Sequence, residues 1–149
     1  TKQSFISIYY MKDYPPAAGI LVFRLFDNRF HLLVLHGLDG RLDIPKGVCD
    51  PGEDTFAAAL RETEEEAGIT DLSFPLGQVN ECFDALYTYI AITEQDVEIR
   101  PNPHSGITEH TGYEWMDLDS AKNAPWSPYL KNSVDWALFY IKNYLEEQQ

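Results

Sequence analysis

The stretch that decides the fold is GVCDPGEDTFAAALRETEEEAGI, residues 47–69. A loop rich in glycine and proline occupies its first third. The pattern that follows predicts a helix over residues 54–67, with Asp54 as the N-cap and Gly68 at the stop. At about 100° per residue one helical face gathers five side chains, which we expect to pack against a sheet. They are Phe56, Ala59, Leu60, Thr63 and Ala67.

The four glutamates near the end of this helix are not equivalent. Glu62, Glu65 and Glu66 project from one flank, whereas Glu64 projects near the opposite flank. Three carboxylates at this spacing repel one another, and a bound divalent cation removes that cost. Carboxylate oxygens are also preferred ligands of Mg²⁺. Taken alone, however, an acidic helix face in contact with water explains the cluster at least as well.

The segment that enters the helix changes this balance. Pro45-Lys46-Gly47 and Pro51-Gly52-Glu53 let the backbone approach a ligand closely. Lys46 supplies a point charge for a phosphate, and the N-terminal end of a helix favours anions. The sequence thus brings a cation, an accessible backbone and a carboxylate cluster to one place.

These residues resemble the Nudix box, Gly-x5-Glu-x7-Arg-Glu-U-x-Glu-Glu-x-Gly-U, where U is a bulky apolar residue. Every fixed position from Gly47 to Gly68 matches, and the departure is Thr63 at an apolar position. A further departure is Leu42, where the family commonly has Trp. The resemblance implies an α/β fold, an α/β/α sandwich with a mixed sheet, and a hydrolase that cleaves a pyrophosphate bond in a nucleoside diphosphate linked to another group.

The resemblance also implies roles for the residues of the box. Glu62, Glu65 and Glu66, with the carbonyl of Gly47, match the ligands of the catalytic Mg²⁺, for which Mn²⁺ can substitute. Arg61 and Glu53 match partners that orient the helix and its glutamates. A general base then takes a proton from the attacking water. We favour Glu62 for this step and keep Glu109, in a predicted polar loop over residues 101–112, as the alternative.

Substrate choice depends on residues outside the box. Tyr87 and Tyr89 share one face of a predicted strand, and an aromatic ring can stack on a nucleobase. The position of Tyr87 after the box is similar to that of a tyrosine in the diadenosine polyphosphate hydrolases of the Nudix family. This resemblance implies Tyr113 as a second stacking candidate and Arg41 as a phosphate contact. Ordinary packing remains the alternative for both tyrosines.

Diadenosine tetraphosphate or a related dinucleoside polyphosphate is therefore the expected substrate. One alternative is another member of the same family that acts on ADP-ribose, a nucleotide cofactor or the 5′ end of RNA. A second alternative is a nucleotide-binding module without catalysis, which the intact glutamates disfavour.

The rest of the chain fits one domain over residues 1–149. Residues 1–16 lead in, and strands are predicted over 18–26, 29–36, 42–44, 86–92, 97–100 and 113–118, with a turn at Asp27-Asn28. The chain closes with a helix whose apolar residues recur on one face. They are Val134, Ala137, Leu138, Ile141 and Leu145.

Composition narrows the class of protein. The formal net charge of −13 disfavours binding to a nucleic-acid backbone, although a small anionic nucleotide is compatible when divalent cations offset the field. No apolar run spans a bilayer, the N-terminus shows no signal-peptide pattern, and the two cysteines form no zinc or disulfide framework. We therefore expect a soluble cytoplasmic protein with a small-molecule partner and no membrane association.

Overall fold

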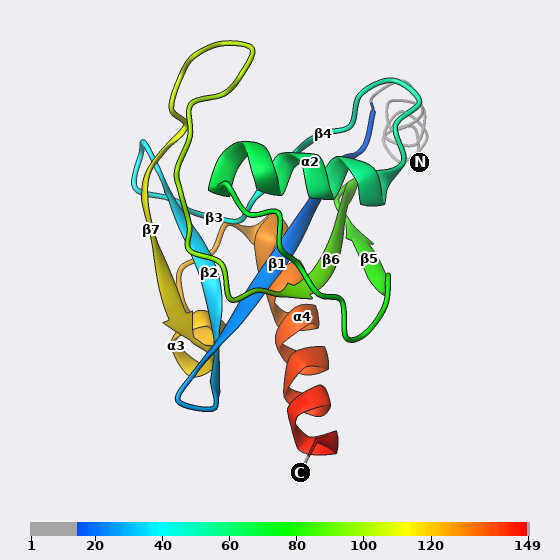
Figure 1. Ribbon diagram of the computed structural model, residues 1–149, viewed down its shortest axis with the longest axis vertical. Coiled ribbons are helices and arrows are strands. Elements are labelled where there is room, and N and C mark those ends of the chain that lie inside the picture. Colours follow the sequence, from blue (N-terminus) through cyan, green and yellow to red (C-terminus); the bar gives the residue numbers. More distant parts are fainter. Residues whose placement is uncertain (1–14, 149) are drawn as a thin grey trace, which may run out of the picture.

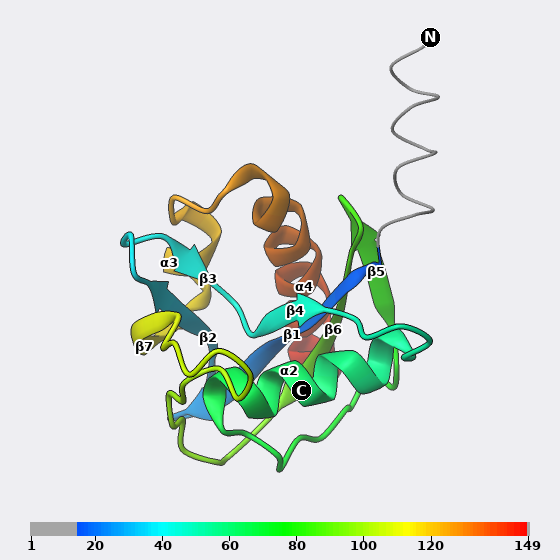
Figure 2. The ribbon, with the colours of Figure 1, turned by 90° about the horizontal axis from the view of Figure 1, so that it is seen from above.

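The computed structural model describes residues 15–148 and places a mixed sheet between helices (Figures 1 and 2). The strands are β1 (Ala17–Phe26), β2 (Arg29–Gly37), β3 (Leu42–Asp43), β4 (Lys46–Val48), β5 (Asn80–Phe83), β6 (Leu86–Ile92) and β7 (His110–Asp117). The helices are α2 (Thr55–Ala67), α3 (Leu118–Asn123) and α4 (Pro128–Glu147). Helix α2 covers one face of the sheet and α4 covers the other, which confirms the predicted α/β/α sandwich.

Strand β1 lies at the centre of the sheet. It pairs antiparallel with β2 and β4 and parallel with β6. Its side chains alternate between two cores: Ile20 and Val22 face α2, whereas Leu21 and Phe23 face α4. Because helices cover both faces, the strand needs a continuous apolar run and not an alternating one.

The predicted turn and the predicted helix caps are found at the ends of strands and of the helix in the structure. Asp27 and Asn28 both have positive φ angles, as a two-residue turn between β1 and β2 requires. The Asp54 side chain accepts a hydrogen bond from the Ala57 amide at 3.2 Å, and Gly68 ends α2 with φ of 69°. The prediction of the helix is confirmed.

The C-terminal helix packs as predicted. Val134, Ala137, Leu138 and Ile141 are buried against the sheet, and Leu145 is partly buried beside them. None of the helices over residues 15–148 is both long and apolar enough to cross a membrane.

Other predictions of secondary structure were wrong. Residues 97–100 form no strand; Val97 and Ile99 instead pack beside the core under α2, where the Glu98 amide donates to the Ala67 carbonyl at 2.8 Å. The edge strand β5 and the short helix α3 were missed. The lead-in proposed for residues 1–16 lies outside the described residues, apart from Pro15 and Pro16.

Strand β7 starts earlier than predicted, at His110. It follows β2 as far as the pairing of Gly37 with His110, beyond an irregularity between His36 and Gly37. The polar loop is therefore shorter, and its last residues belong to the sheet. This extension places His110 beside the helix that carries the glutamates.

Candidate active site

Helix α2 presents its glutamates as the helical spacing predicts. Glu66 is buried, Glu62 and Glu65 are half-buried, and Glu64 is exposed to solvent. Thr63 is buried, and its hydroxyl donates to the Ala59 carbonyl at 2.8 Å, so the polar residue at an apolar position is satisfied within the helix.

The predicted sheet-facing stripe of α2 needs one correction. Leu60 is exposed, and Ala58 is buried in its place. The helix is therefore rotated slightly on the sheet compared with the prediction. The centre of its buried face lies closer to Glu66 and Glu62 than the predicted stripe does. A small alanine next to the strands permits this close approach.

Gly47 lies directly against the carboxylate of Glu62. Strand β4 pairs with β1 through Ala18 and Gly47, and this pairing holds the Gly47 backbone beside α2. A Cβ atom at residue 47 would overlap the Glu62 carboxyl group. The glycine therefore leaves room for a carboxylate and exposes its own backbone next to it.

Arg61 connects the entry loop to the glutamates. Its Nε and Nη2 donate to both carboxylate oxygens of Glu53 at 3.0 and 2.9 Å, and Nη2 also donates to the Val48 carbonyl at 3.1 Å. Its Nη1 donates to Glu62 at 2.9 Å and to Glu65 at 3.2 Å. These hydrogen bonds hold the pKa of Glu53 below its usual range and raise the pKa of Arg61. The geometry matches an orienting role for Arg61 and Glu53.

Glu66 is the most unusual carboxyl group of the site. Its side chain is buried, and its Oε2 has no hydrogen-bond partner among the described residues. Burial, with the negative charge of Asp43 beside it, raises the pKa of Glu66 to about 9. Without a cation this group is therefore protonated at neutral pH. A buried carboxyl oxygen with no partner is a place where a cation would be stabilised.

Asp43 and His110 join this cluster, although sequence reasoning gave neither a role. His110 Nε2 donates to Asp43 Oδ2 at 3.0 Å, and its Nδ1 lies 3.9 Å from Glu66 Oε2. Lys46 Nζ lies 3.1 Å from Asp43 Oδ1. Burial raises the pKa of Asp43, but His110 and Lys46 outweigh it and hold that pKa below its usual value. The predicted phosphate contact Lys46 is thereby fixed beside Glu66.

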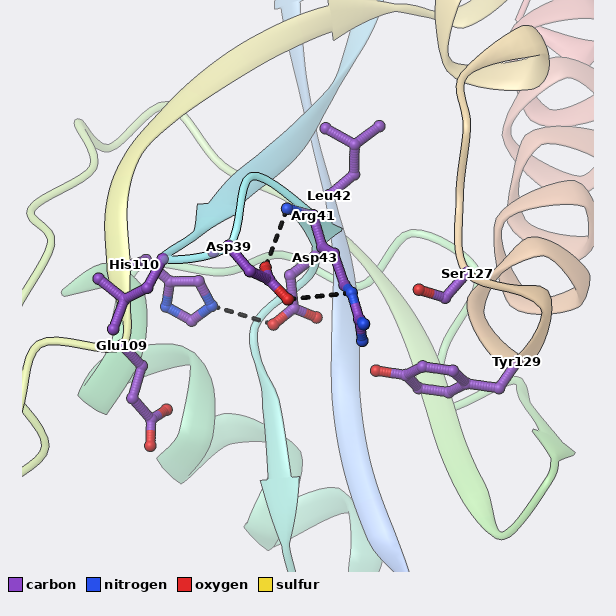
Figure 3. A pocket seen from close by; sticks show the side chains of 10 residues that line it. Asp39, Arg41, Leu42, Asp43, Glu109, His110, Ser127 and Tyr129 are labelled. Carbon is purple, nitrogen blue, oxygen red and sulfur yellow. Dashed lines mark hydrogen bonds and ion pairs between the residues drawn. The ribbon is translucent and has the colours of Figure 1, made fainter.

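A hollow of about 400 Å³ opens next to these residues (Figure 3). We call it the Tyr129 hollow. In Figure 3 the Tyr129 ring extends from the start of α4 toward the Arg41 side chain. Arg41 is 77% exposed and pairs with Asp39 at 2.9 Å. The hollow is lined by Gly37, Leu38, Asp39, Arg41, Leu42, Asp43, Glu109, His110, Ser127 and Tyr129.

The other predicted site residues lie in different surroundings. Glu109 is exposed, and it lines both the Tyr129 hollow and a narrow cleft that contains Glu62, Glu65 and Glu66. Tyr87 is half-buried on β6 against the core under α2. Tyr113 is 43% exposed on β7, which is separated from β6 by β1 and β2. Neither ring lines the Tyr129 hollow, so the stacking roles of both tyrosines stay predictions.

The donor set fits a divalent cation in two respects. The unpartnered Glu66 oxygen and the Gly47 backbone that lies against the Glu62 carboxylate are both features that an oxygen-bound cation would use. Over residues 15–148 no three acidic, histidine or cysteine side chains are already gathered as a ligand set. Arg61 holds Glu62 and Glu65 by direct hydrogen bonds, and these side chains would have to turn to bind an ion together with Glu66.

Sequence reasoning missed Tyr129, Asp43 and His110. His110 lies in the segment predicted as a polar loop, and Asp43 lies in a predicted short strand. In the sequence, Asp43 stands three residues before Lys46, and His110 directly follows Glu109. Pairing across the sheet, which brings them together, is not visible along the chain.

Comparison with known proteins identifies the family of the chain. A family model described as NUDIX domain matches residues 13–137. Two curated relatives named bis(5′-nucleosyl)-tetraphosphatase (asymmetrical) come from Caenorhabditis elegans and Rattus norvegicus. They are 29% identical over 113 residues and 32% identical over 126 residues, and each comparison covers 70% of this chain and 80% of the relative.

Solved structures show the same fold. A crystal structure of a C. elegans Ap4A hydrolase binary complex is 25% identical, with a TM-score of 0.66, over 88% of this chain and 97% of that chain. The NUDIX domain of Shewanella oneidensis NrtR, complexed with ADP ribose, is 17% identical with a TM-score of 0.58, over 90% of this chain and 97% of that chain, which shows the fold alone. The chain therefore belongs to the NUDIX family and is a NUDIX pyrophosphohydrolase.

Proposed function

We propose that this protein hydrolyses a pyrophosphate bond in a dinucleoside polyphosphate, with diadenosine tetraphosphate as the first candidate and Mg²⁺ as the cofactor. The observation that carries the proposal is the contact between the Tyr129 hollow and the glutamates. Glu109 and His110 line both this hollow and the narrow cleft beside Glu62, Glu65 and Glu66. A nucleoside in the hollow would therefore have its phosphates next to the carboxylates. The names of the relatives from C. elegans and R. norvegicus support the choice of substrate.

The cation would be held by Glu62, Glu65 and Glu66 together with the Gly47 carbonyl. When bound, it neutralises phosphate charge and lowers the pKa of a bound water. Arg61 holds Glu62 and Glu65 on the flank of α2 next to Glu66, and both side chains would turn from Arg61 to the ion. Manganese, with the same preference for oxygen ligands, is expected to substitute.

Cations of the chain itself bind the phosphates. Lys46 is fixed by Asp43 at the edge of the cluster, and Arg41 extends into the Tyr129 hollow. The exposed Tyr129 ring offers a stacking surface for a nucleobase within the same hollow. Tyr87 and Tyr113 remain candidates for this role from the sequence.

Glu109 is better placed than Glu62 to act as the general base. The Glu62 carboxylate accepts a hydrogen bond from Arg61 and lies against Gly47, so its position suits an ion ligand. Glu109 is exposed between the Tyr129 hollow and the glutamates, where it can reach a water molecule at a bound phosphate. We therefore propose Glu109 as the general base, and Glu62, which the sequence favoured, stays the alternative.

The test is a screen of nucleotide pyrophosphates with 5 mM MgCl₂ or with EDTA, followed by product analysis. We expect ATP plus AMP from diadenosine tetraphosphate with Mg²⁺ and no turnover with EDTA. Glu65→Gln should lower turnover by orders of magnitude, and Glu94→Gln, at an exposed carboxylate away from the site, is its control. AMP plus ribose phosphate from ADP-ribose, with diadenosine tetraphosphate untouched, would replace the substrate with one of the family alternatives.

A cytoplasmic location completes the proposal. It rests on a nucleotide substrate and on two cysteines that form no zinc or disulfide framework in the sequence. The small-molecule substrate also agrees with the strongly acidic surface, which repels long nucleic acids.

A further inference from the structure

A second hollow lies beside Glu65 and shares no lining residue with the Tyr129 hollow. It is a groove of about 320 Å³ between α2 and the segment that follows β6, and we call it the Arg100 groove. Figure 2 shows this segment passing close to the C-terminal half of α2. The groove is lined by Arg61, Glu64, Glu65, Arg100, Pro101 and Pro103.

The narrow cleft that holds the glutamates shares lining residues with both hollows. That cleft shares Glu109 and His110 with the Tyr129 hollow. It shares Glu65 and Arg100 with the Arg100 groove. A linear ligand whose centre lies at the glutamates therefore has a hollow available at each end.

Arg100 is the cation that a polyphosphate chain would meet at the entrance to this groove. Its only ion pair among the described residues joins Nη2 to Glu98 Oε2 at 3.5 Å, and its side chain is 42% exposed. Arg61, in contrast, is fully engaged by Glu53, Glu62 and Glu65. Because its pairing is weak, Arg100 can turn toward a phosphate at little cost.

The rest of the groove suits an uncharged nucleoside better than further phosphates. The carboxylates of Glu64 and Glu65 would repel a phosphate but can accept hydrogen bonds from ribose hydroxyl groups. Glu64 is exposed, and no ion pair of the described residues involves its side chain. Pro101 and Pro103 add apolar ring surface that can lie against a base.

We propose that the Arg100 groove binds the second nucleoside of a dinucleoside polyphosphate. The inference rests on the proposed function, since the first nucleoside occupies the Tyr129 hollow and the phosphates cross the glutamates. Arg100 binds the phosphates at the junction, Glu64 accepts from the ribose, and the two prolines contact the base. This subsite makes the chain selective for substrates with a nucleoside at both ends.

The test compares diadenosine tetraphosphate with adenosine 5′-tetraphosphate, which has the same phosphate chain but lacks the second nucleoside. Glu64→Ala and Pro103→Ala are each expected to raise KM for diadenosine tetraphosphate by roughly three- to tenfold, the effect of one lost hydrogen bond or stacking contact. Neither variant changes the KM for adenosine 5′-tetraphosphate as a substrate, or its Ki as a competitive inhibitor. Glu94→Ala, which removes an exposed carboxylate outside the groove, controls for the change in net charge.

Three outcomes separate the two proposals. A selective rise in KM for the dinucleotide supports the subsite. Equal effects on both ligands, or no effect on either, would overturn the subsite while leaving hydrolysis of dinucleoside polyphosphates intact. If the wild-type chain does not turn over diadenosine tetraphosphate, the proposed function itself is wrong and the subsite falls with it. Thermal melts of each variant exclude loss of the fold.

Discussion

Gly47 faces the Glu62 carboxylate so closely that no side chain fits between them. The contact joins β4 to α2, two elements that lie on either side of the loop in the Nudix box. In steric terms, a side chain at residue 47 would displace the Glu62 carboxylate.

Gly47→Ala is therefore expected to displace the Glu62 carboxyl group. Because this group is the end of a flexible side chain, the free energy of unfolding should change little, whereas the displaced carboxylate should lower kcat at least tenfold. Gly112→Ala is the control, because a Cβ there meets no atom within 4 Å. Urea unfolding and steady-state kinetics measure both effects, and a Gly47→Ala variant with wild-type kcat would contradict the steric account.

A second prediction concerns Glu66 and pH in the absence of metal. Its pKa rises from the ordinary value of 4.5 to about 9 in the folded protein, so the folded chain retains a proton that the unfolded chain releases. The free energy of unfolding therefore falls as pH rises between these two values. Glu66→Gln cannot titrate and lacks this slope. In EDTA, the variant should become increasingly more stable than wild type from pH 5 to pH 9.

The same variant should behave oppositely when metal is added. Wild type gains thermal stability on addition of Mg²⁺ because an ion that binds only the folded chain stabilises it. Glu66→Gln loses a ligand, so its melting temperature should change little and its turnover should drop by orders of magnitude. An equal metal-induced shift in both proteins would show that Glu66 does not bind the ion.

Arg61 provides a third prediction, because its hydrogen bonds reach the loop and the helix together. Arg61→Lys keeps the charge but loses the planar fork that binds both oxygens of Glu53. We expect a loss of about 1–3 kcal/mol in the free energy of unfolding, together with a fall in kcat. Arg24→Lys is the matched control, since Arg24 is similarly buried but makes a single ion pair, with Asp96. If both variants lost the same free energy of unfolding, Arg61 would contribute no more to stability than an ordinary ion pair does.

The sequence predicts the box well and its surroundings poorly, for a physical reason. The positions of Glu62, Glu65 and Glu66 follow from helical geometry, which depends on neighbours three and four residues away. The contact between Asp43 and His110 depends on β2, which lies between β3 and β7. His36 of β2 pairs with Leu42 of β3 on one side and with Gly112 of β7 on the other. Such pairing between residues far apart in the chain leaves no periodic signal.

The errors at residues 97–100 have a related cause. Alternating Val97 and Ile99 have the pattern of a strand with one buried face, and in the structure they do bury their side chains. The sheet positions beside β6 are already occupied by β1 and β5, so no strand edge is left for them. Alternation thus predicted burial correctly and backbone pairing incorrectly.

The last prediction decides which aromatic ring binds the base. Tyr129 is exposed in the Tyr129 hollow, and base stacking on an aromatic ring contributes about 1–3 kcal/mol. Tyr129→Ala should therefore raise KM for diadenosine tetraphosphate by about tenfold, with little change in stability, whereas Tyr129→Phe should retain the wild-type KM. Tyr87→Ala removes a half-buried ring from the core under α2, so its main effect should be on stability. A large rise in KM for Tyr87→Ala with none for Tyr129→Ala would return the stacking role to Tyr87, as the sequence alone predicted.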